Sequence, residues 1–216
     1  MASSARSFVL RQTRLGSVPG IDGIRLHLGV EILPLWHAVQ LETHDPEAPL
    51  PYWAFAWGGG LAIARYLAEH PEAVAGRRVV DVASGSGLCA IAALRAGASE
   101  ATGIDIDSFA VAAMRLNGRA NRVRLTAITR DVLDEEPLDA DVVLAGDCWY
   151  EAGLAARVTR WLRAASDSGL DVLIGDPGRR YLPIGELEEL ACYEVRTTTE
   201  LEDLDRKDAR VYRLRH

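Results

Sequence analysis

The residues best suited to chemistry in this sequence follow a short apolar run in its first half. Val79-Val80-Asp81-Val82 leads directly into Ala83-Ser84-Gly85-Ser86-Gly87. Glycines at the junction of a strand and a helix let the backbone turn tightly and approach a ligand without a Cβ in the way. We therefore predict a cofactor site formed by Asp81, Ser84, Gly85 and Gly87.

The carboxyl group of Asp81 distinguishes between two classes of cofactor. Gly85, Gly87 and Ala90 satisfy the dinucleotide pattern G-x-G-x-x-G/A, so the glycines alone do not decide. Asp81 would repel a pyrophosphate but would attract a sulfonium or an ammonium group. The methyltransferase pattern D-x-G-x-G-x-G is matched at three of its four fixed positions, with Ala83 in place of the first glycine. The sequence favours S-adenosylmethionine over NAD, and an ordinary tight turn is the alternative without a ligand.

Two further acids follow later apolar segments. Asp105 ends the segment Ala101–Asp105, where a carboxylate can accept hydrogen bonds from both ribose hydroxyls. Asp131 lies in Arg130-Asp131-Val132 and is placed to accept a hydrogen bond from an adenine amino group. A solvated carboxylate in a turn is the alternative for Asp131.

A second group of reactive side chains ends another apolar run, in Ala145-Gly146-Asp147-Cys148-Trp149-Tyr150-Glu151. Ligands of open α/β sheets bind beyond the carboxyl ends of the strands, so these side chains are predicted to lie beside the cofactor. Two carboxylates and two aromatic rings suit an amine acceptor, because the rings attract a cation and a carboxylate orients the nitrogen.

Methyl transfer to an amine requires the neutral nitrogen, whereas a lysine amine is almost entirely protonated at neutral pH. We expect Asp147 to capture and aim the ammonium, while its proton leaves to water or to Glu151. The alternative is that these residues only cap the strand and pack the following helix.

The elements that position these residues alternate between strand and helix. This rhythm predicts a parallel sheet covered on both faces. Asp107 is predicted to cap the helix through Phe109 and Leu116. Strands are expected at Arg78–Val82, Ala101–Asp105, Val123–Thr129, Asp141–Ala145 and Leu170–Gly175, and helices at Leu88–Ala96 and Gly153–Ala165.

Both ends of the chain depart from this alternation. A helix near Ile184–Leu190 and strands at Tyr193–Thr199 and Ala209–Arg215 are predicted, and a closing hairpin makes one strand antiparallel to the others. Near the start, Ile24–Gln40 could form a helix that Pro34 kinks or begins anew. The fold class is therefore α/β, a Rossmann-like, mostly parallel sheet of seven strands with an antiparallel strand near the C-terminus and helices on both faces.

Composition narrows the functional class. The 216 residues are 49% hydrophobic and carry a formal net charge of −7. We expect one domain, 1–216, with an N-terminal arm and aromatic loop in 1–60 and the core in 61–216. The excess of acidic residues argues against a nucleic acid as the main binding partner. No apolar run reaches transmembrane length. Three cysteines without zinc spacing predict no metal site and a cytoplasmic protein with reduced thiols.

With both motifs in place, the chain resembles bacterial members of the electron transfer flavoprotein β-subunit lysine methyltransferase family, which are class I methyltransferases. Asp147-Cys148-Trp149-Tyr150 fits the D-x-x-Y motif of the wider group of lysine methyltransferases. Further segments resemble this family at Phe8–Arg14, Ile24–Leu28, Pro51–Gly60 and Gly175–Arg179.

The resemblance implies that Trp57 and the adjoining glycines, including Gly59, line the cofactor pocket. It implies that Asp147 and Tyr150 frame a target lysine on a flavoprotein β subunit, with a ribosomal protein as a second possible substrate. Trp149, Trp53 and Phe55 are expected to contact the substrate, although Trp53 and Phe55 could equally anchor the arm. We expect a monomer that acts without nucleic acid or membrane. The alternatives are a small-molecule N-methyltransferase, a catalytically silent cofactor-binding module and, last, an NAD-dependent oxidoreductase.

Overall fold

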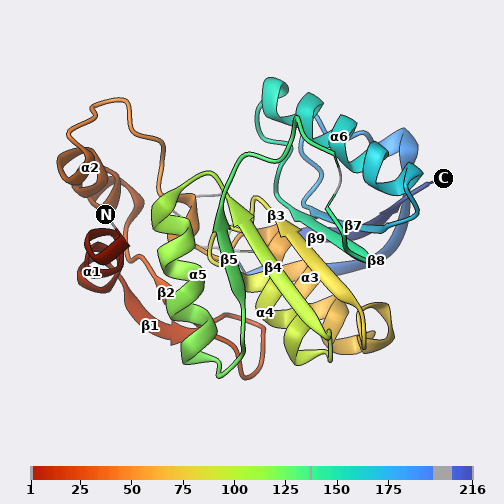
Figure 1. Cartoon of the computed structure of the whole chain (residues 1–216), viewed down its shortest axis with the longest axis horizontal. Helices are drawn as coiled ribbons and strands as arrows, with labels where there is room; N and C mark the ends of the chain where they lie inside the picture. Colours follow the sequence, from red (N-terminus) through yellow and green to blue (C-terminus); the bar gives the residue numbers. More distant parts are fainter. Residues whose placement is uncertain (1, 137, 197–205, 216) are drawn as a thin grey trace.

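A computed structural model describes residues 2–136, 138–196 and 206–215, and it has a seven-stranded sheet at its centre (Figure 1). The strand order is β5-β4-β3-β6-β7-β9-β8, in which β9 is antiparallel to both of its neighbours and the other pairings are parallel. This arrangement confirms the predicted fold class. The strands are β3 (Arg78–Val82), β4 (Glu100–Asp105), β5 (Thr126–Thr129), β6 (Val142–Gly146), β7 (Asp171–Asp176), β8 (Leu187–Arg196) and β9 (Arg206–Leu214).

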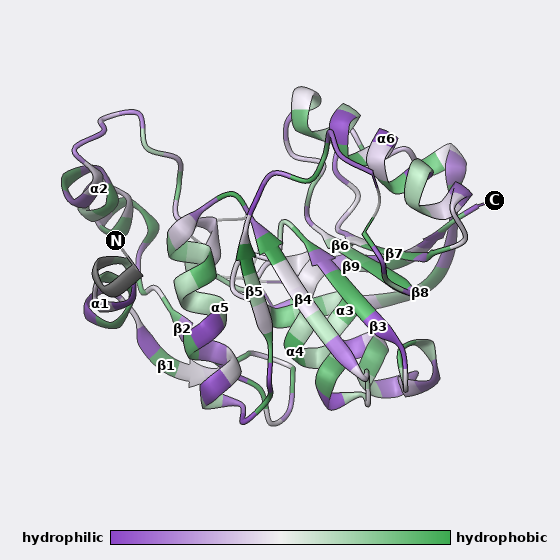
Figure 2. Ribbon diagram, viewed as in Figure 1, coloured by the Kyte–Doolittle hydropathy of each residue, from purple (hydrophilic) through white to green (hydrophobic). Residues whose placement is uncertain are grey.

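Helices cover both faces of the sheet because alternate residues of its strands point to opposite sides. Val142 and Leu144 of β6 pack with α3 and α4, whereas Val143 and Ala145 pack with α6. Figure 2 shows apolar residues along the strands and hydrophilic residues on the outer side of α6. These helices are α3 (Gly58–Glu69), α4 (Leu88–Arg95), α5 (Ser108–Ala120) and α6 (Ala152–Asp167).

The predicted helix near Ile184–Leu190 is wrong. A single 3-10 turn, Ile184–Glu186, leads into β8, which already begins at Leu187. The register of β8 against β9 shifts between Glu189 and Ala191, and this bulge breaks the alternation of apolar and polar residues that would have marked a strand. The predicted hairpin is confirmed in β8 and β9, while residues 197–199 lie outside the described part of the chain.

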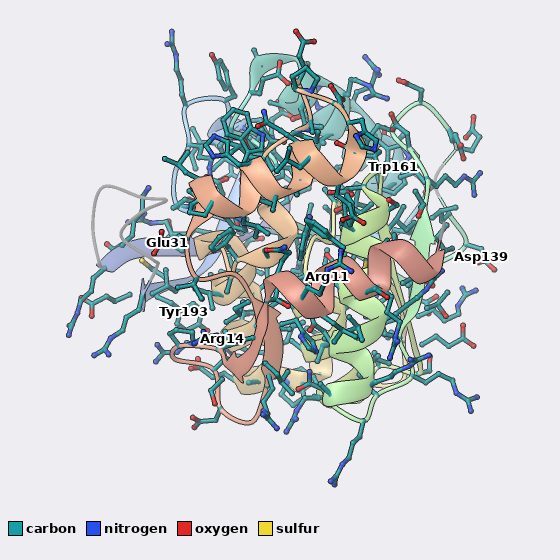
Figure 3. The ribbon with its side chains drawn as sticks, turned by 90° about the vertical axis from the view of Figure 1, so that its left-hand side faces the viewer. Arg11, Arg14, Glu31, Asp139, Trp161 and Tyr193 are labelled. Atoms are coloured by element: carbon teal, nitrogen blue, oxygen red, sulfur yellow. The ribbon has the colours of Figure 1, made fainter. Side chains whose placement is uncertain are left out.

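The N-terminal arm packs against the sheet domain rather than lying free. It comprises α1 (Ala2–Gln12), a hairpin of β1 (Arg14–Ser17) and β2 (Arg25–Leu28), and α2 (Ile32–Thr43). Figure 3 shows α1 crossing in front of α5, and the rings of Phe8 and Phe109 join the two helices with centroids 4.7 Å apart. Arg11 of α1 also pairs with Glu42 of α2 at 3.0 Å.

The prediction for Ile24–Gln40 was half right. Its first part is a strand, and the helix begins only after Glu31. Pro34 lies in the first turn of α2, where a missing N–H costs no hydrogen bond, so the proline begins a helix instead of kinking one. No helix in the described ranges is long and apolar enough to cross a membrane.

One buried asparagine connects the arm to the glycine loop. Asn117 of α5 accepts a hydrogen bond from the backbone N–H of His27 at 2.7 Å and donates one to the carbonyl of Ser86 at 2.8 Å. A fully buried amide with these partners is costly to replace, because removal leaves buried backbone groups unpaired. The position of the arm is therefore coupled to the loop that faces the cofactor site.

Candidate active site

A cavity of about 700 Å³ opens at the carboxyl ends of β3, β4 and β6. Its walls come from four segments that the sequence singled out and from the aromatic loop. They include Asp81–Ser86, Ile104–Asp107, Arg130–Leu133 and Gly146–Cys148, together with Tyr52, Trp53, Phe55 and Trp57. The edge of the sheet predicted to bind ligand is the edge that carries the cavity.

The glycine loop turns through three residues with positive φ. Gly85 (φ 53°) lines the cavity, and its N–H donates to Oδ2 of Asp105 at 2.9 Å. Gly87 (φ 81°) does not line the cavity, because it faces α5, where an added Cβ would lie 3.0 Å from Cγ of Met114. Ala83, which stands in place of the first glycine of the pattern, also has a positive φ of 52°, so its Cβ lies in a strained conformation.

Asp81 lies at the floor of this loop. Its Oδ2 accepts hydrogen bonds from the hydroxyl of Ser84 at 2.5 Å and from the N–H of Ala90 at 3.1 Å. Burial raises the pKa of Asp81 to about 7 despite these two donors. A cation brought into the cavity would favour the ionised carboxylate, as the sequence argument requires.

The next two acids line the cavity together with an exposed apolar residue. Asp105 accepts hydrogen bonds from Gly85 and, at 2.9 Å, from the N–H of Asp107, and burial raises its pKa. Asp131 accepts from the N–H of Leu133 at 3.1 Å and pairs with Arg157 at 2.9 Å. Ile106, which follows Asp105 in the chain, also lines the cavity and is 71% exposed. An exposed apolar residue in a cavity that also holds two carboxylates suits a nucleoside with a flat base.

Trp53 supplies an independent test of the fit. Its side chain lines the cavity and is buried, yet no partner for its indole Nε1 is found among the described residues. Unpaired buried donors are rare in proteins and point to a missing ligand or water. S-adenosylmethionine fits this cavity, which offers the unpaired indole N–H of Trp53, the carboxylates along the loops and the exposed Ile106.

The acceptor end of the cavity is organised around Asp147. This residue follows β6 with a positive φ of 62°, a conformation that aspartate tolerates better than most side chains. Its N–H donates to the carbonyl of Gly175 at 2.9 Å, and its Oδ2 accepts the N–H of Gly60 at 2.8 Å. The backbone of two neighbouring elements thus fixes the direction of the carboxylate.

Gly59 has a different role from the one the resemblance implied. It does not line the cavity, since it packs against β7, where an added Cβ would lie 2.1 Å from the carbonyl oxygen of Gly175. Gly60 lines the cavity in its place. The glycines therefore allow α3 to approach β7 closely, which brings the N–H of Gly60 to Asp147.

Aromatic rings surround the acceptor end. The ring of Tyr52 lies 5.3 Å from that of Tyr150 and 5.5 Å from that of Trp57, centroid to centroid. Burial raises the pKa of Tyr150 to about 12, so its phenol is neutral at physiological pH. Trp53 and Phe55 line the cavity and are also packed in the core with Phe109, so they anchor the arm, and their contact with the substrate stays a prediction.

Two predicted residues do not reach the cavity. Trp149 is fully buried on the α6 side of the sheet, where its Nε1 donates to Oγ1 of Thr159 at 3.1 Å. Glu151 caps α6 by accepting hydrogen bonds from the N–H groups of Gly153 and Leu154. Trp149 is therefore placed away from the expected substrate contact, whereas the part of Glu151 in the reaction stays a prediction.

Arg179, which lies in the loop after β7, was not predicted as a site residue from the sequence. Its guanidinium binds Oδ1 of Asp147 at 2.5 Å and Oδ2 of Asp176 at 3.2 Å. Asp176 is fully buried and also accepts the N–H groups of Gly178 and Arg179. The only signal for Arg179 was its place after the carboxyl end of a strand, in a segment noted for resemblance alone.

Comparisons with known proteins agree with this geometry. The family model described as Ribosomal protein L11 methyltransferase (PrmA) matches residues 66–146, the part that carries the glycine loop. The electron transfer flavoprotein beta subunit lysine methyltransferase of Xenopus laevis is 36% identical over 217 residues, which cover 98% of this chain and 87% of that protein. The chain belongs to this family.

Other members of the family align in the same way. The Caenorhabditis elegans homolog is 30% identical over 91% of this chain and 85% of its own length. The Danio rerio protein is 42% identical over a shorter stretch, which covers 63% of this chain and 55% of that protein. As a family member, the chain is an S-adenosylmethionine-dependent methyltransferase, as the motifs predicted.

Solved structures show the same fold. The Thermus thermophilus 16S rRNA N2 G1207 methyltransferase, in complex with AdoMet and guanosine, superposes with a TM-score of 0.58 at 19% identity over 95% of this chain and 51% of that one. The ribosomal protein L11 methylase of Lactobacillus delbrueckii subsp. bulgaricus gives a TM-score of 0.53 at 18% identity over 80% and 84%. At these identities the likeness concerns the fold alone.

Proposed function

We propose that this enzyme methylates lysine side chains of the electron transfer flavoprotein β subunit. The observation that carries the proposal is the match along 98% of the chain to a relative named for that activity. The site agrees with an extended substrate, because Tyr150 at the acceptor end is 49% exposed and leaves the aromatic cluster open on that side.

The roles of the cofactor residues follow from their chemistry. S-adenosylmethionine, when bound, supplies a methyl group made electrophilic by a sulfonium. Asp81 attracts the positive charge, Asp105 accepts hydrogen bonds from the ribose, and Asp131 accepts one from the adenine amino group. Ser84, Gly85 and Trp57 complete the walls around them.

Asp147 aims the target amine, and Arg179 moderates its effect. When both acids are ionised, Asp147, Asp176 and Arg179 together carry one net negative charge, enough to attract an ammonium. A carboxylate alone would hold the proton on the amine, and the guanidinium at 2.5 Å offsets that tendency. The proton leaves to water, since Glu151 caps α6 and does not line the cavity.

The compartment, the oligomeric state and the class of partner are inferred from the sequence. We infer a cytoplasmic monomer, formed by one domain, that acts on protein and not on nucleic acid or membranes. The net charge of −7 supports the absence of nucleic acid, and the three cysteines, all free thiols, support a reducing compartment.

A transfer assay tests the substrate. The purified enzyme and methyl-labelled S-adenosylmethionine are incubated separately with the flavoprotein from the same organism, with ribosomal proteins and with a small-molecule extract. We expect label on lysines of the flavoprotein β subunit. Label confined to the ribosomal or the small-molecule fraction would replace the proposed substrate, and cofactor binding without any transfer would indicate a silent binding module.

A further inference from the structure

The chain contains a single lysine, and that lysine lies in the wall of the active-site cavity. Of the 24 basic residues only Lys207 is a lysine, and every other one is an arginine. Lys207 lines the same cavity as Asp147, Trp57 and Gly60.

The register of the C-terminal hairpin explains how a strand residue reaches the cavity. Arg210 of β9 pairs with Asp176, the last residue of β7. Lys207 comes three residues before Arg210 and pairs only with Val195 of β8. At about 3.4 Å per residue, β9 has by then run about 10 Å past the carboxyl end of β7. The hairpin therefore forms a wall above the edge that holds the reacting groups.

The strand also presents Lys207 to the side of the sheet that holds the acceptor site. Side chains alternate along a strand, so Lys207 shares a face with Ala209 and Val211. Both of these pack in the cluster formed with α3, the helix whose N-terminal Gly60 binds Asp147. Sequence position, register and face thus place Lys207 in the wall of the cavity that also holds Asp147.

We propose that Lys207 is methylated by the active site of its own chain. The inference rests on the proposed lysine specificity. The ammonium of Lys207 first loses a proton to water, and its nitrogen then forms a bond to the methyl carbon. The bond between that carbon and the cofactor sulfur breaks, its electron pair stays on sulfur, and S-adenosylhomocysteine is released. Because the bound cofactor and Lys207 would share one cavity, the methyl transfer takes place within one enzyme–cofactor complex and needs no encounter between two protein molecules.

A single lysine makes the test unusually direct. The full-length protein, purified from its own host, is digested without trypsin, and the mass of the peptide that contains Lys207 is measured. We expect a fraction of this peptide to carry added methyl groups. The protein is then incubated with methyl-labelled S-adenosylmethionine, with the flavoprotein in the same mixture, and both proteins are digested.

The expected result is label on Lys207, at a rate per molecule that does not change on dilution, and loss of that label in Lys207→Arg. Label on the flavoprotein without label on Lys207 would overturn this inference and leave the proposed function intact. Label on neither protein would overturn both. A rate that falls on dilution would overturn methylation within one chain, and label that persists in Lys207→Arg would assign the modification to another amine.

Discussion

Replacing Arg179 with glutamine should destabilise the protein far more than breaking an ion pair on its surface. The side chains of Arg179, Asp147 and Asp176 are 17%, 12% and 0% exposed, so the variant leaves two carboxylates largely out of water without their shared cation. Removing one partner of a buried pair typically costs about 3–5 kcal/mol. For a chain of this size, the corresponding fall in melting temperature is on the order of 10 °C.

Arg163→Gln is the matched control, because Arg163 pairs with Glu186 at side-chain exposures of 52% and 40%. Exposed pairs contribute about 0–1 kcal/mol. The free energy of unfolding is measured by urea denaturation for the wild type and for both variants. Equal losses for Arg163→Gln and Arg179→Gln would refute the assignment of a buried cluster.

The pH dependence supplies a second check on Arg179→Gln. Burial raises the pKa of Asp176 in the folded protein, and Arg179 opposes that rise. Without the guanidinium the pKa rises further, so the loss of stability is full above the folded pKa and shrinks as acidification protonates the carboxyl group. A deficit that stays constant or grows as the pH falls would contradict this account.

Three further predictions concern the cofactor loop and the helix cap. Ala83→Gly should raise the free energy of unfolding by about 1 kcal/mol in urea titrations, because it removes a Cβ at φ 52°, and a loss of stability would contradict the strain. As Asp81 protonates below about pH 7, the affinity for S-adenosylmethionine, measured by calorimetry, should fall by up to about tenfold per pH unit. The same dependence of affinity on pH in Asp81→Asn would exclude Asp81 as its cause. Glu151→Gln should cost about 1 kcal/mol of stability by weakening the cap of α6 but leave turnover unchanged, and a large loss of turnover would return Glu151 to the reaction.

The parts of the fold that could be predicted are those where local pattern and burial agree. β6 is a continuous apolar run because both of its faces are covered, and α6 after it shows one apolar side. The second part of β8 was predicted as a strand from Tyr193, but its first part was not, because a bulge shifts the alternation in Leu187–Leu190 to a spacing that also fits a helix. The difference lies in tertiary pairing, which the local sequence does not contain.

The site shows the same division. Asp81 and Asp105 were predictable because they end strands whose direction fixes the edge they face. Trp149 packs on the α6 side and Glu151 caps α6, which is the alternative stated for this segment, because residue types alone did not decide between that and a place beside the amine. Arg179 was missed because its role depends on the distance between two loops that meet only after β6 and β7 pair. Residue types after strands thus predict the edge, but they do not predict which side chains turn inward.

Asp147→Asn tests the central claim most directly. Asparagine tolerates the positive φ of 62° and can still accept the N–H of Gly60, so the fold and the cofactor cavity should persist. Single-turnover methylation of the flavoprotein β subunit and the dissociation constant of S-adenosylmethionine are measured side by side, with Glu151→Gln as the control. We expect transfer to fall by about 10²-fold or more with unchanged cofactor affinity. Transfer at the wild-type rate, or a loss of affinity as large as the loss of transfer, would contradict the role of Asp147 as the group that aims the amine.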